Sequence, residues 1–161
     1  MPSRRGSPIH GEILTRAEVE AYLRRHIPLS AALGLRAVDV GGDRIVLEAP
    51  LGPNLNHQAT AFGGSVSAVA ILAGWATVHF RLRAAGYAAL TVIQDSSIRY
   101  DAPIHSAFRA ASTPVDDATW SRFTRALARR GKGRVPVDVA VEADGRVAAT
   151  FHGRYVALAE S

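Results

Sequence analysis

The feature that most constrains this chain is a long segment without charge: residues 49–80 contain no Asp, Glu, Lys or Arg. Its second half, from Val66 to Phe80, is apolar on nearly all sides of a helix, a pattern typical of a helix enclosed by the rest of a fold. A membrane span is excluded, because Pro, Asn, His and Gln interrupt the first half and the second half is too short to cross a bilayer. The segment therefore predicts one buried central helix.

Local patterns on both sides of this segment predict two more helices and six strands. A capping box at Thr15 begins one helix, which ends before Pro28, and Trp120, Phe123 and Leu127 recur at helical spacing. The expected strands are residues 35–40, 44–49, 90–100, 107–114, 135–141 and 147–158, the last two as a hairpin. We expect strand 107–114 to pair with strand 90–100. Because no regular βαβ alternation appears, the order predicts an α+β fold with an antiparallel sheet wrapped around the apolar helix.

Length and composition indicate one domain. The chain has 161 residues, of which 48% are hydrophobic and 20% charged, which are ordinary values for a globular protein. We expect residues 1–12 to form a disordered leader without an export signal, and residues 13–161 to form the domain. The absence of cysteine excludes disulfides, thiolate metal sites and a cysteine nucleophile, and it fits a cytoplasmic protein. The histidines lack metal-ligand spacing, so we expect no metal.

The net charge of +5 does not by itself identify a partner. No nucleic-acid-binding motif accompanies it, so we expect neither a nucleic-acid nor a membrane partner. Basic residues gather on and after the helix predicted around Phe123, and Arg125 and Arg129 are candidate contacts for an acidic carrier protein or for the phosphates of coenzyme A. The alternative is a solvated helix face with favourable charge at its C-terminal end.

The loop before the central helix contains the candidate chemistry. Residues 49–65 are rich in amide, hydroxyl and imidazole groups and end in Gly63, Gly64 and Ser65. Glycine lets a ligand approach the backbone, and the first N–H groups of a helix have no partner within it. Such donors can hold a carbonyl oxygen and stabilise negative charge that develops on it.

This loop and its surroundings resemble the thioesterases of hot-dog fold, and more narrowly the branch of the YiiD C-terminal type. The resemblance rests on the runs Ile27-Pro28-Leu29-Ser30, Ala49-Pro50-Leu51, Pro53-Asn54-Leu55-Asn56-His57, Thr60-Ala61-Phe62-Gly63-Gly64-Ser65 and Leu72-Ala73-Gly74-Trp75. It implies a hot-dog homodimer or a tetramer that acts on acyl-CoA or acyl-carrier-protein substrates. Coenzyme A or phosphopantetheine would then be part of the substrate, and no resident cofactor is implied.

The resemblance also implies which residues form the site. The catalytic candidates are Asn56, His57, Gly64, Ser65 and Asp95, and the substrate-binding candidates are Thr60, Phe62, Gly63, Arg125 and Arg129. Structural roles compete with these assignments. Asn56 could be a turn residue, and Thr60 and Ser65 are residue types that cap helices. His79, on the apolar helix, is expected to be a core histidine with its hydrogen bonds satisfied.

One departure from the family pattern leaves three functions open. Many hot-dog thioesterases carry an Asp or Glu on or near the central helix, and this chain has none between Glu48 and Asp95. Hydrolysis of a thioester needs a group that activates water or attacks the carbonyl, and His57, Asp95 and Ser65 are the candidates. Decarboxylation of a malonyl thioester, known in some members of the branch, needs only donors for an enolate and an apolar place for the carboxylate. A non-catalytic acyl-CoA-binding module is the third possibility.

Overall fold

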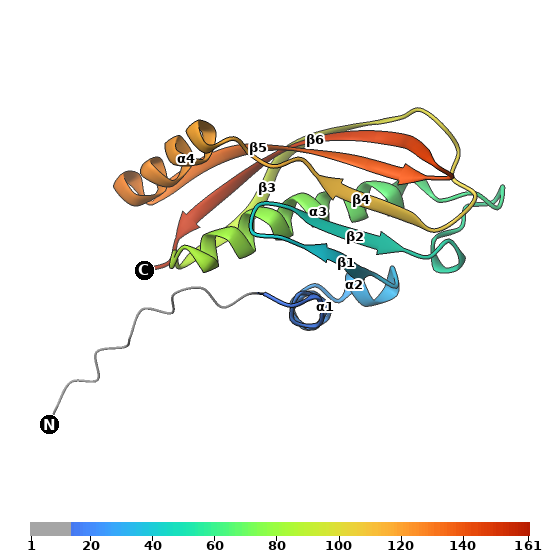
Figure 1. Ribbon diagram of the computed structural model, residues 1–161, viewed down its shortest axis with the longest axis horizontal. Coiled ribbons are helices and arrows are strands. Elements are labelled where there is room, and N and C mark those ends of the chain that lie inside the picture. Colours follow the sequence, from blue (N-terminus) through green and yellow to red (C-terminus); the bar gives the residue numbers. More distant parts are fainter. Residues whose placement is uncertain (1–13) are drawn as a thin grey trace, which may run out of the picture.

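The computed structural model describes residues 14–161, so the expected leader at residues 1–12 lies outside the described residues. Figure 1 shows a long central helix against a curved sheet, with three smaller helices at the periphery. The elements are α1 (Arg16–His26), α2 (Leu29–Ala32), β1 (Arg36–Val40), β2 (Ile45–Ala49), the 3-10 turn η1 (Gly52–Asn54), α3 (Gly63–Ala84), β3 (Ala89–Tyr100), β4 (Phe108–Ser112), α4 (Asp117–Arg130), β5 (Lys132–Ala143) and β6 (Arg146–Ala159).

The six strands form one sheet in the order β1-β2-β4-β5-β6-β3, and every neighbouring pair is antiparallel. This confirms the predicted α+β class and the β5–β6 hairpin. The predicted pairing of residues 107–114 with 90–100 is wrong. The neighbour of β3 is β6, whose 14 residues match the 12 of β3 along most of its length, whereas β4 has only five residues and pairs with β2 and β5.

Helix α3 is the core element that the charge-free segment predicted. By length and hydropathy it could cross a membrane, but 67% of its most apolar window is buried inside the fold. At mid-helix, Gly74 brings the helix backbone close to β6: a methyl group at this position would overlap the hydroxyl of Tyr155. The Tyr155 hydroxyl donates a 2.7 Å hydrogen bond to the carbonyl oxygen of Ile71. This contact fixes α3 against the inner face of the sheet.

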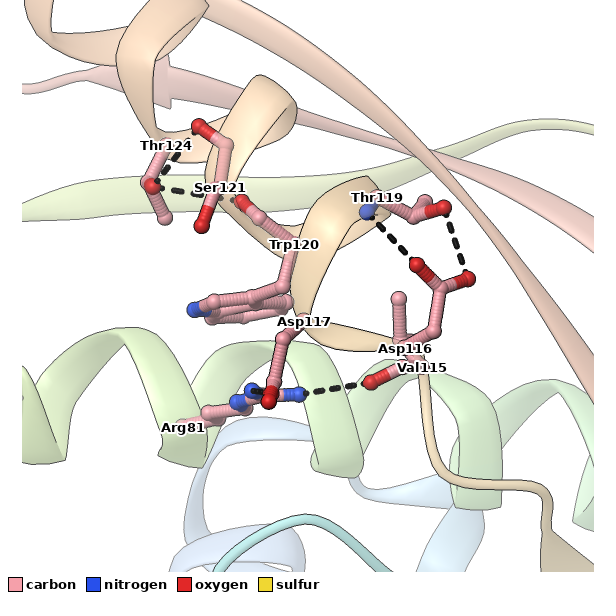
Figure 2. Close-up of polar contacts among 8 residues, drawn as sticks. All are labelled: Arg81, Val115, Asp116, Asp117, Thr119, Trp120, Ser121 and Thr124. Atoms are coloured by element: carbon pink, nitrogen blue, oxygen red, sulfur yellow. Dashed lines mark hydrogen bonds and ion pairs between the residues drawn. The ribbon is translucent and has the colours of Figure 1, made fainter.

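The side chain of Arg81, in the C-terminal half of α3, contacts α4 and the segment just before it, as Figure 2 shows. The guanidinium group lies 4.1 Å from the ring centroid of Trp120, donates to the carbonyl of Val115 at 3.3 Å and approaches the carboxylate of Asp117 at 3.9 Å. Asp116 caps the helix by accepting from the amide of Thr119 at 2.8 Å. This hydrogen bond holds the pKa of the Asp116 carboxyl below its usual value.

Strand β3 forms one edge of the sheet and exposes apolar side chains there. Leu90 and Val92 have 56% and 49% of their surface exposed, and the strand is 12 residues long. A long edge strand with unpaired backbone groups and apolar side chains is a template for pairing with another chain. The edge therefore has the properties of an interface.

Candidate active site

The start of α3 has no side-chain cap. Phe62 occupies the N-cap position, and the amide of Val66 donates to the carbonyl of Phe62 at 3.1 Å. Within residues 14–161, the amides of Gly63, Gly64 and Ser65 have no hydrogen-bond acceptor. Neither Thr60 nor Ser65 caps the helix, contrary to their structural interpretation. The helix therefore begins with free backbone donors and the positive end of its dipole.

The loop before the helix is held by two asparagines. The side-chain amide of Asn54, which is 2% exposed, donates to the carbonyls of Leu33 and Pro50 at 2.9 and 2.8 Å. The side chain of Asn56 closes a turn: its oxygen accepts from the amides of Gln58 and Thr60, and its nitrogen donates to the Thr60 hydroxyl at 2.8 Å. Asn56 thus shapes the loop, and one of its two N–H groups has no acceptor within the described chain.

Beside the helix start lies a pocket of about 320 Å³. Its lining includes Gly63 and Val66 of α3, Tyr100 at the end of β3, and Asp101 and Ile104 of the following segment. The hydroxyl of Tyr100 donates to the carbonyl of Gly63 at 2.9 Å. The carboxylate of Asp101 accepts from the guanidinium of Arg99 at 2.9 Å. The pocket wall thus combines apolar side chains with one carboxylate next to free backbone donors.

Two aromatic rings flank the two glycines. The Tyr100 ring lies 3.4 Å from where a side chain on Gly63 would begin, and a methyl group on Gly64 would overlap the ring of Phe62. Tyr100 and Phe62 are about half exposed, at 50% and 55%. Because glycine has no side chain, both rings can lie against the backbone where the donors are.

The structure brings together most of the predicted loop residues. Gly63, Gly64, Ser65 and Phe62 lie at the helix start, and Asn56 and Thr60 bond to each other in the loop immediately before it. His57 lies exposed in the same loop, at the turn that Asn56 closes. These positions leave the predicted roles open, but they place the candidate groups at one end of α3.

Asp95 does not join this cluster. Residues 91 and 93 of β3 point towards the core, and simple alternation would place Asp95 with them. A β-bulge between Ile93 and Asp95 reverses the alternation, so Asp95 pairs with Arg154 of β6 and its carboxylate lies 3.5 Å from that guanidinium. Arg154 alternates with the buried Gly153 and Tyr155, so this ion pair lies on the outer face of the sheet, away from α3.

Arg125 and Arg129 also lie apart from the helix start within one chain. Both are exposed on α4, which contacts α3 at Arg81. Arg81 lies eighteen positions after Gly63 on the helix, or about 27 Å away along the axis at the usual rise per residue. The substrate of a carrier protein bound at α4 would have to extend over about this distance to reach the helix start of the same chain. The alternative is that it enters the helix start of a second copy of the chain.

Sequence reasoning missed Tyr100 and Asp101. A signal for them was present: a strand that follows α3 through a short turn runs back along it, so the end of that strand returns to the start of the helix. Asp101 is the carboxylate that lines the pocket, although it lies outside the charge-free segment. The sequence pattern of the strand or of the helix, taken alone, does not show that the end of β3 lies close to the start of α3.

His79, at the other end of α3, is not the fully hydrogen-bonded core histidine that the sequence predicted. It is 8% exposed, but its Nε2 atom has no hydrogen-bond partner among the described residues. Burial, with the nearby charges of Arg83 and His26, lowers the pKa of the imidazole to about 4. The side chain is therefore a neutral, incompletely satisfied histidine.

Comparison with known proteins agrees with this architecture. The model of the family described as "Putative thioesterase (yiiD_Cterm)" matches residues 16–159, from the first residue of α1 to the last of β6. The chain belongs to this thioesterase family. The family assignment confirms the resemblance drawn from the loop motifs, and it covers all the described helices and strands.

Solved structures show the same fold. A protein of unknown function from Chlorobaculum tepidum is 28% identical, with 92% of this chain and 99% of that chain covered and a TM-score of 0.86. A Shewanella oneidensis protein that carries the thioesterase description is also 28% identical, with 89% and 96% covered and a TM-score of 0.78. A thioesterase from Haemophilus influenzae shares the fold at a TM-score of 0.73, with 14% identity and coverage of 92% and 93%. The chain therefore has the hot-dog fold of these thioesterases.

Proposed function

We propose that this member of the thioesterase family hydrolyses acyl thioesters at the start of α3. The observation that carries the proposal is the uncapped helix N-terminus with its three free amides, the first of which belongs to Gly63, a residue that lines the pocket with Tyr100 and Asp101. Backbone donors of this kind stabilise the negative oxygen of a tetrahedral intermediate, and loss of one costs about 3 kcal/mol of barrier.

In the proposed reaction, the thioester carbonyl oxygen accepts from the amides of Gly63 and Gly64. Water attacks the carbonyl carbon, the C–S bond breaks, and the products are a carboxylic acid and a free thiol. The carboxylate of Asp101 is the proposed base, because it lines the pocket. His57, in the exposed loop before the helix, is the alternative base. Asn56 keeps its predicted role if its unpaired N–H reaches the same carbonyl oxygen.

Decarboxylation of a malonyl thioester is the second candidate function. The observation that favours it is the ion pair between Arg99 and Asp101, which already engages the one carboxylate beside the donors. In this reaction the C–C bond to the carboxylate breaks, carbon dioxide leaves, and the electron pair forms an enolate whose oxygen faces the same amides. Protonation of the enolate carbon by water then gives an acetyl thioester. No base is required.

The proposed substrates are acyl-CoA or an acyl carrier protein, with the acyl carrier docking on Arg125 and Arg129. Support for this comes from the exposure of both arginines on α4. A homodimer formed through β3 is part of the proposal, because antiparallel pairing of two β3 edges would place α4 of one copy nearer the helix start of the other. Charge reversal at both arginines is expected to raise KM for carrier-bound substrate; an unchanged KM excludes docking there.

One experiment separates the functions. Purified protein is incubated with malonyl and longer acyl thioesters of coenzyme A and of carrier protein, and the products are identified by mass spectrometry. Free thiol identifies hydrolysis, and acetyl thioester from malonyl thioester identifies decarboxylation. Binding without either product identifies the third possibility, a non-catalytic acyl-CoA-binding module.

The variant Asp101→Asn tests the assigned base. For hydrolysis we expect kcat to fall about 100-fold, within the usual range for loss of a general base, with little change in KM. For decarboxylation we expect kcat to stay within about threefold, since no base acts. Asp43→Asn, an exposed change in the β1–β2 turn, is the matched control. Hydrolysis that survives in Asp101→Asn but not in His57→Gln would transfer the role to His57.

A further inference from the structure

The end of β3 places one hydroxyl group on the first turn of α3. The 22 residues of α3 span about 33 Å and the 12 residues of β3 about 40 Å, so a strand that turns back after the helix returns to its start. Tyr100, the last residue of β3, pairs with Ala149 of β6, and the next amide, that of Asp101, donates to the carbonyl of Ala148 at 2.8 Å. The sheet therefore fixes the backbone of Tyr100 beside the helix start.

The Tyr100 hydroxyl and the free amide of Gly64 belong to opposite sides of one peptide unit. The hydroxyl donates to the carbonyl oxygen of Gly63 at 2.9 Å. The nitrogen of the same peptide is that of Gly64, whose N–H has no acceptor among the described residues. In a helix the carbonyl oxygens point towards the C-terminal end and the N–H groups towards the N-terminal end. A ligand at the helix start and the Tyr100 hydroxyl would therefore bind the two ends of the Gly63–Gly64 peptide.

A peptide unit transmits the effect of a hydrogen bond from one end to the other. A donor at the carbonyl oxygen draws electron density from the amide nitrogen through the resonance of the peptide, and the N–H then becomes a stronger donor. This cooperative strengthening is about 10–30% per bond. Because the sheet holds Tyr100 in place, its hydroxyl needs no reorganisation when negative charge develops on a ligand at the amide.

We propose that Tyr100 is a positioning residue that strengthens the Gly64 donor through the carbonyl of Gly63. The inference rests on the proposed function, in which the Gly64 amide faces the negative oxygen, and it applies to a tetrahedral intermediate and to an enolate alike. In this role Tyr100 acts on the peptide rather than on the substrate. A donor of this kind is worth about 10²–10³-fold in kcat, so a gain of about 10–30% in its effect amounts to about two- to eightfold.

The variant Tyr100→Phe removes the hydroxyl and keeps the ring beside Gly63. We expect kcat to fall about two- to eightfold and KM to stay within about twofold, since the polarised donor acts mainly on the charge of the transition state. Tyr87→Phe, in the turn between α3 and β3, is the matched control and is expected to change neither parameter.

Fluorinated tyrosines at position 100 separate donor strength from structure. Site-specific incorporation of 3-fluorotyrosine and then 3,5-difluorotyrosine keeps the hydroxyl and makes it progressively more acidic, hence a stronger donor. At a pH where all the phenols remain protonated, we expect kcat to rise in that order above the value of the unmodified protein. A purely structural contact would not follow this order.

Glycine labelling observes the peptide itself. The chain contains two Gly-Gly pairs, Gly41-Gly42 and Gly63-Gly64. With carbon-13 at the glycine carbonyl and nitrogen-15 at the glycine amide, an NMR correlation between an amide and the preceding carbonyl gives only the signals of Gly42 and Gly64. We expect Tyr100→Phe to shift the Gly64 nitrogen upfield and the fluorinated tyrosines to shift it downfield. The Gly42 signal, from the turn between β1 and β2, is the internal control and is expected to stay in place.

The two readouts distinguish failure of the inference from failure of the proposed function. A Gly64 signal that Tyr100→Phe leaves in place overturns the inference whatever the activity. In an active protein, an unchanged kcat in Tyr100→Phe or a fluorinated series without the expected order also overturns it. Wild-type protein that turns over no thioester overturns the proposed function, and the catalytic role of Tyr100 with it, even where the Gly64 signal moves. If Tyr100→Phe does not fold, the fluorinated proteins decide by the same two measurements.

Discussion

At the scale of single residues, glycines decide what can lie against the start of α3. Gly63 and Gly64 leave their amides free and let Tyr100 and Phe62 pack beside them. Gly64 is exposed, and its φ angle is not in the positive region that favours glycine. Its role is therefore to leave space rather than to adopt an unusual backbone conformation. Its contribution to function and its contribution to stability can therefore be separated by substitution.

Gly64→Ala is expected to lower kcat/KM at least tenfold while the free energy of unfolding changes by less than about 1 kcal/mol. The added methyl overlaps the Phe62 ring, which is exposed and can move, but it then stands beside the donors. Enzyme kinetics and urea denaturation measure the two effects. Gly42→Ala, where a methyl meets nothing within 4 Å, is the matched control. Full activity in Gly64→Ala would remove the helix start from the mechanism.

His79 makes stability depend on pH. The unfolded imidazole binds a proton below its ordinary pKa of 6.5, whereas the folded one does so only below about 4, so its contribution to folding is lost as the pH falls between these values. Between pH 7 and 4.5 we expect the wild-type free energy of unfolding to fall by about 2 kcal/mol more than that of His79→Phe. Urea denaturation at the two pH values measures this. Equal losses in both proteins would show that His79 is protonated in the fold.

At the scale of elements, α3 is held to the sheet by close backbone approach. Gly74 gives room to Tyr155, whose hydroxyl bonds the helix backbone at Ile71. Helix α4 is also positioned by specific contacts, because the side chain of Arg81 on α3 contacts the ring of Trp120 and the carbonyl of Val115. The helices are thus positioned by a few specific contacts within a largely apolar core.

A double-mutant cycle tests the contact between α3 and β6. Gly74→Ala is expected to destabilise the protein by about 3 kcal/mol, because the methyl displaces a buried tyrosine. Tyr155→Phe is expected to cost about 1 kcal/mol for the lost hydrogen bond. The double variant should lose about 1 kcal/mol less than the two together, since removal of the hydroxyl relieves part of the overlap. Chemical denaturation measures all three, and strict additivity would contradict the contact. Gly52→Ala, with nothing within 4 Å, is the control.

At the scale of the whole molecule, the sheet has an open edge next to the helix-start pocket. Strand β3 contributes Tyr100 to this pocket, and it exposes Leu90 and Val92 on the edge where no further strand pairs with it. In the proposed dimer, a second copy would pair along this edge and so lie beside Tyr100 and the helix start. Assembly and activity are therefore expected to change together.

Val92→Lys is expected to weaken the proposed dimer at least tenfold, because the ammonium group would enter an apolar, self-paired edge. Analytical ultracentrifugation over a concentration series measures the dissociation constant. Val147→Lys is the matched control, since this valine is exposed to a similar extent, 48% against 49%, but lies on β6. If Val92→Lys assembles like the wild type, the interface lies elsewhere.

The sequence by itself determined most of the elements and the fold family, although it did not predict the short helix α2 or the 3-10 turn η1. Alternation along strands, helical spacing around Phe123, the capping box at Thr15 and the polar loop before α3 are local signals, and local signals depend on neighbouring residues alone. For that reason the predicted strands and helices lie close to those observed, and the loop residues gather at the helix start. The fold family followed from the same loop motifs.

The tertiary structure alone decided which elements are neighbours. It placed β6 between β5 and β3, turned Asp95 to the outer face through a bulge, and brought Tyr100 and Asp101 to the helix start. It also buried His79 Nε2 and Thr91 Oγ1 without a hydrogen-bond partner among the described residues. These outcomes depend on contacts between residues far apart in the chain, where strand length, register and packing compete. Local periodicity carries no information about that competition.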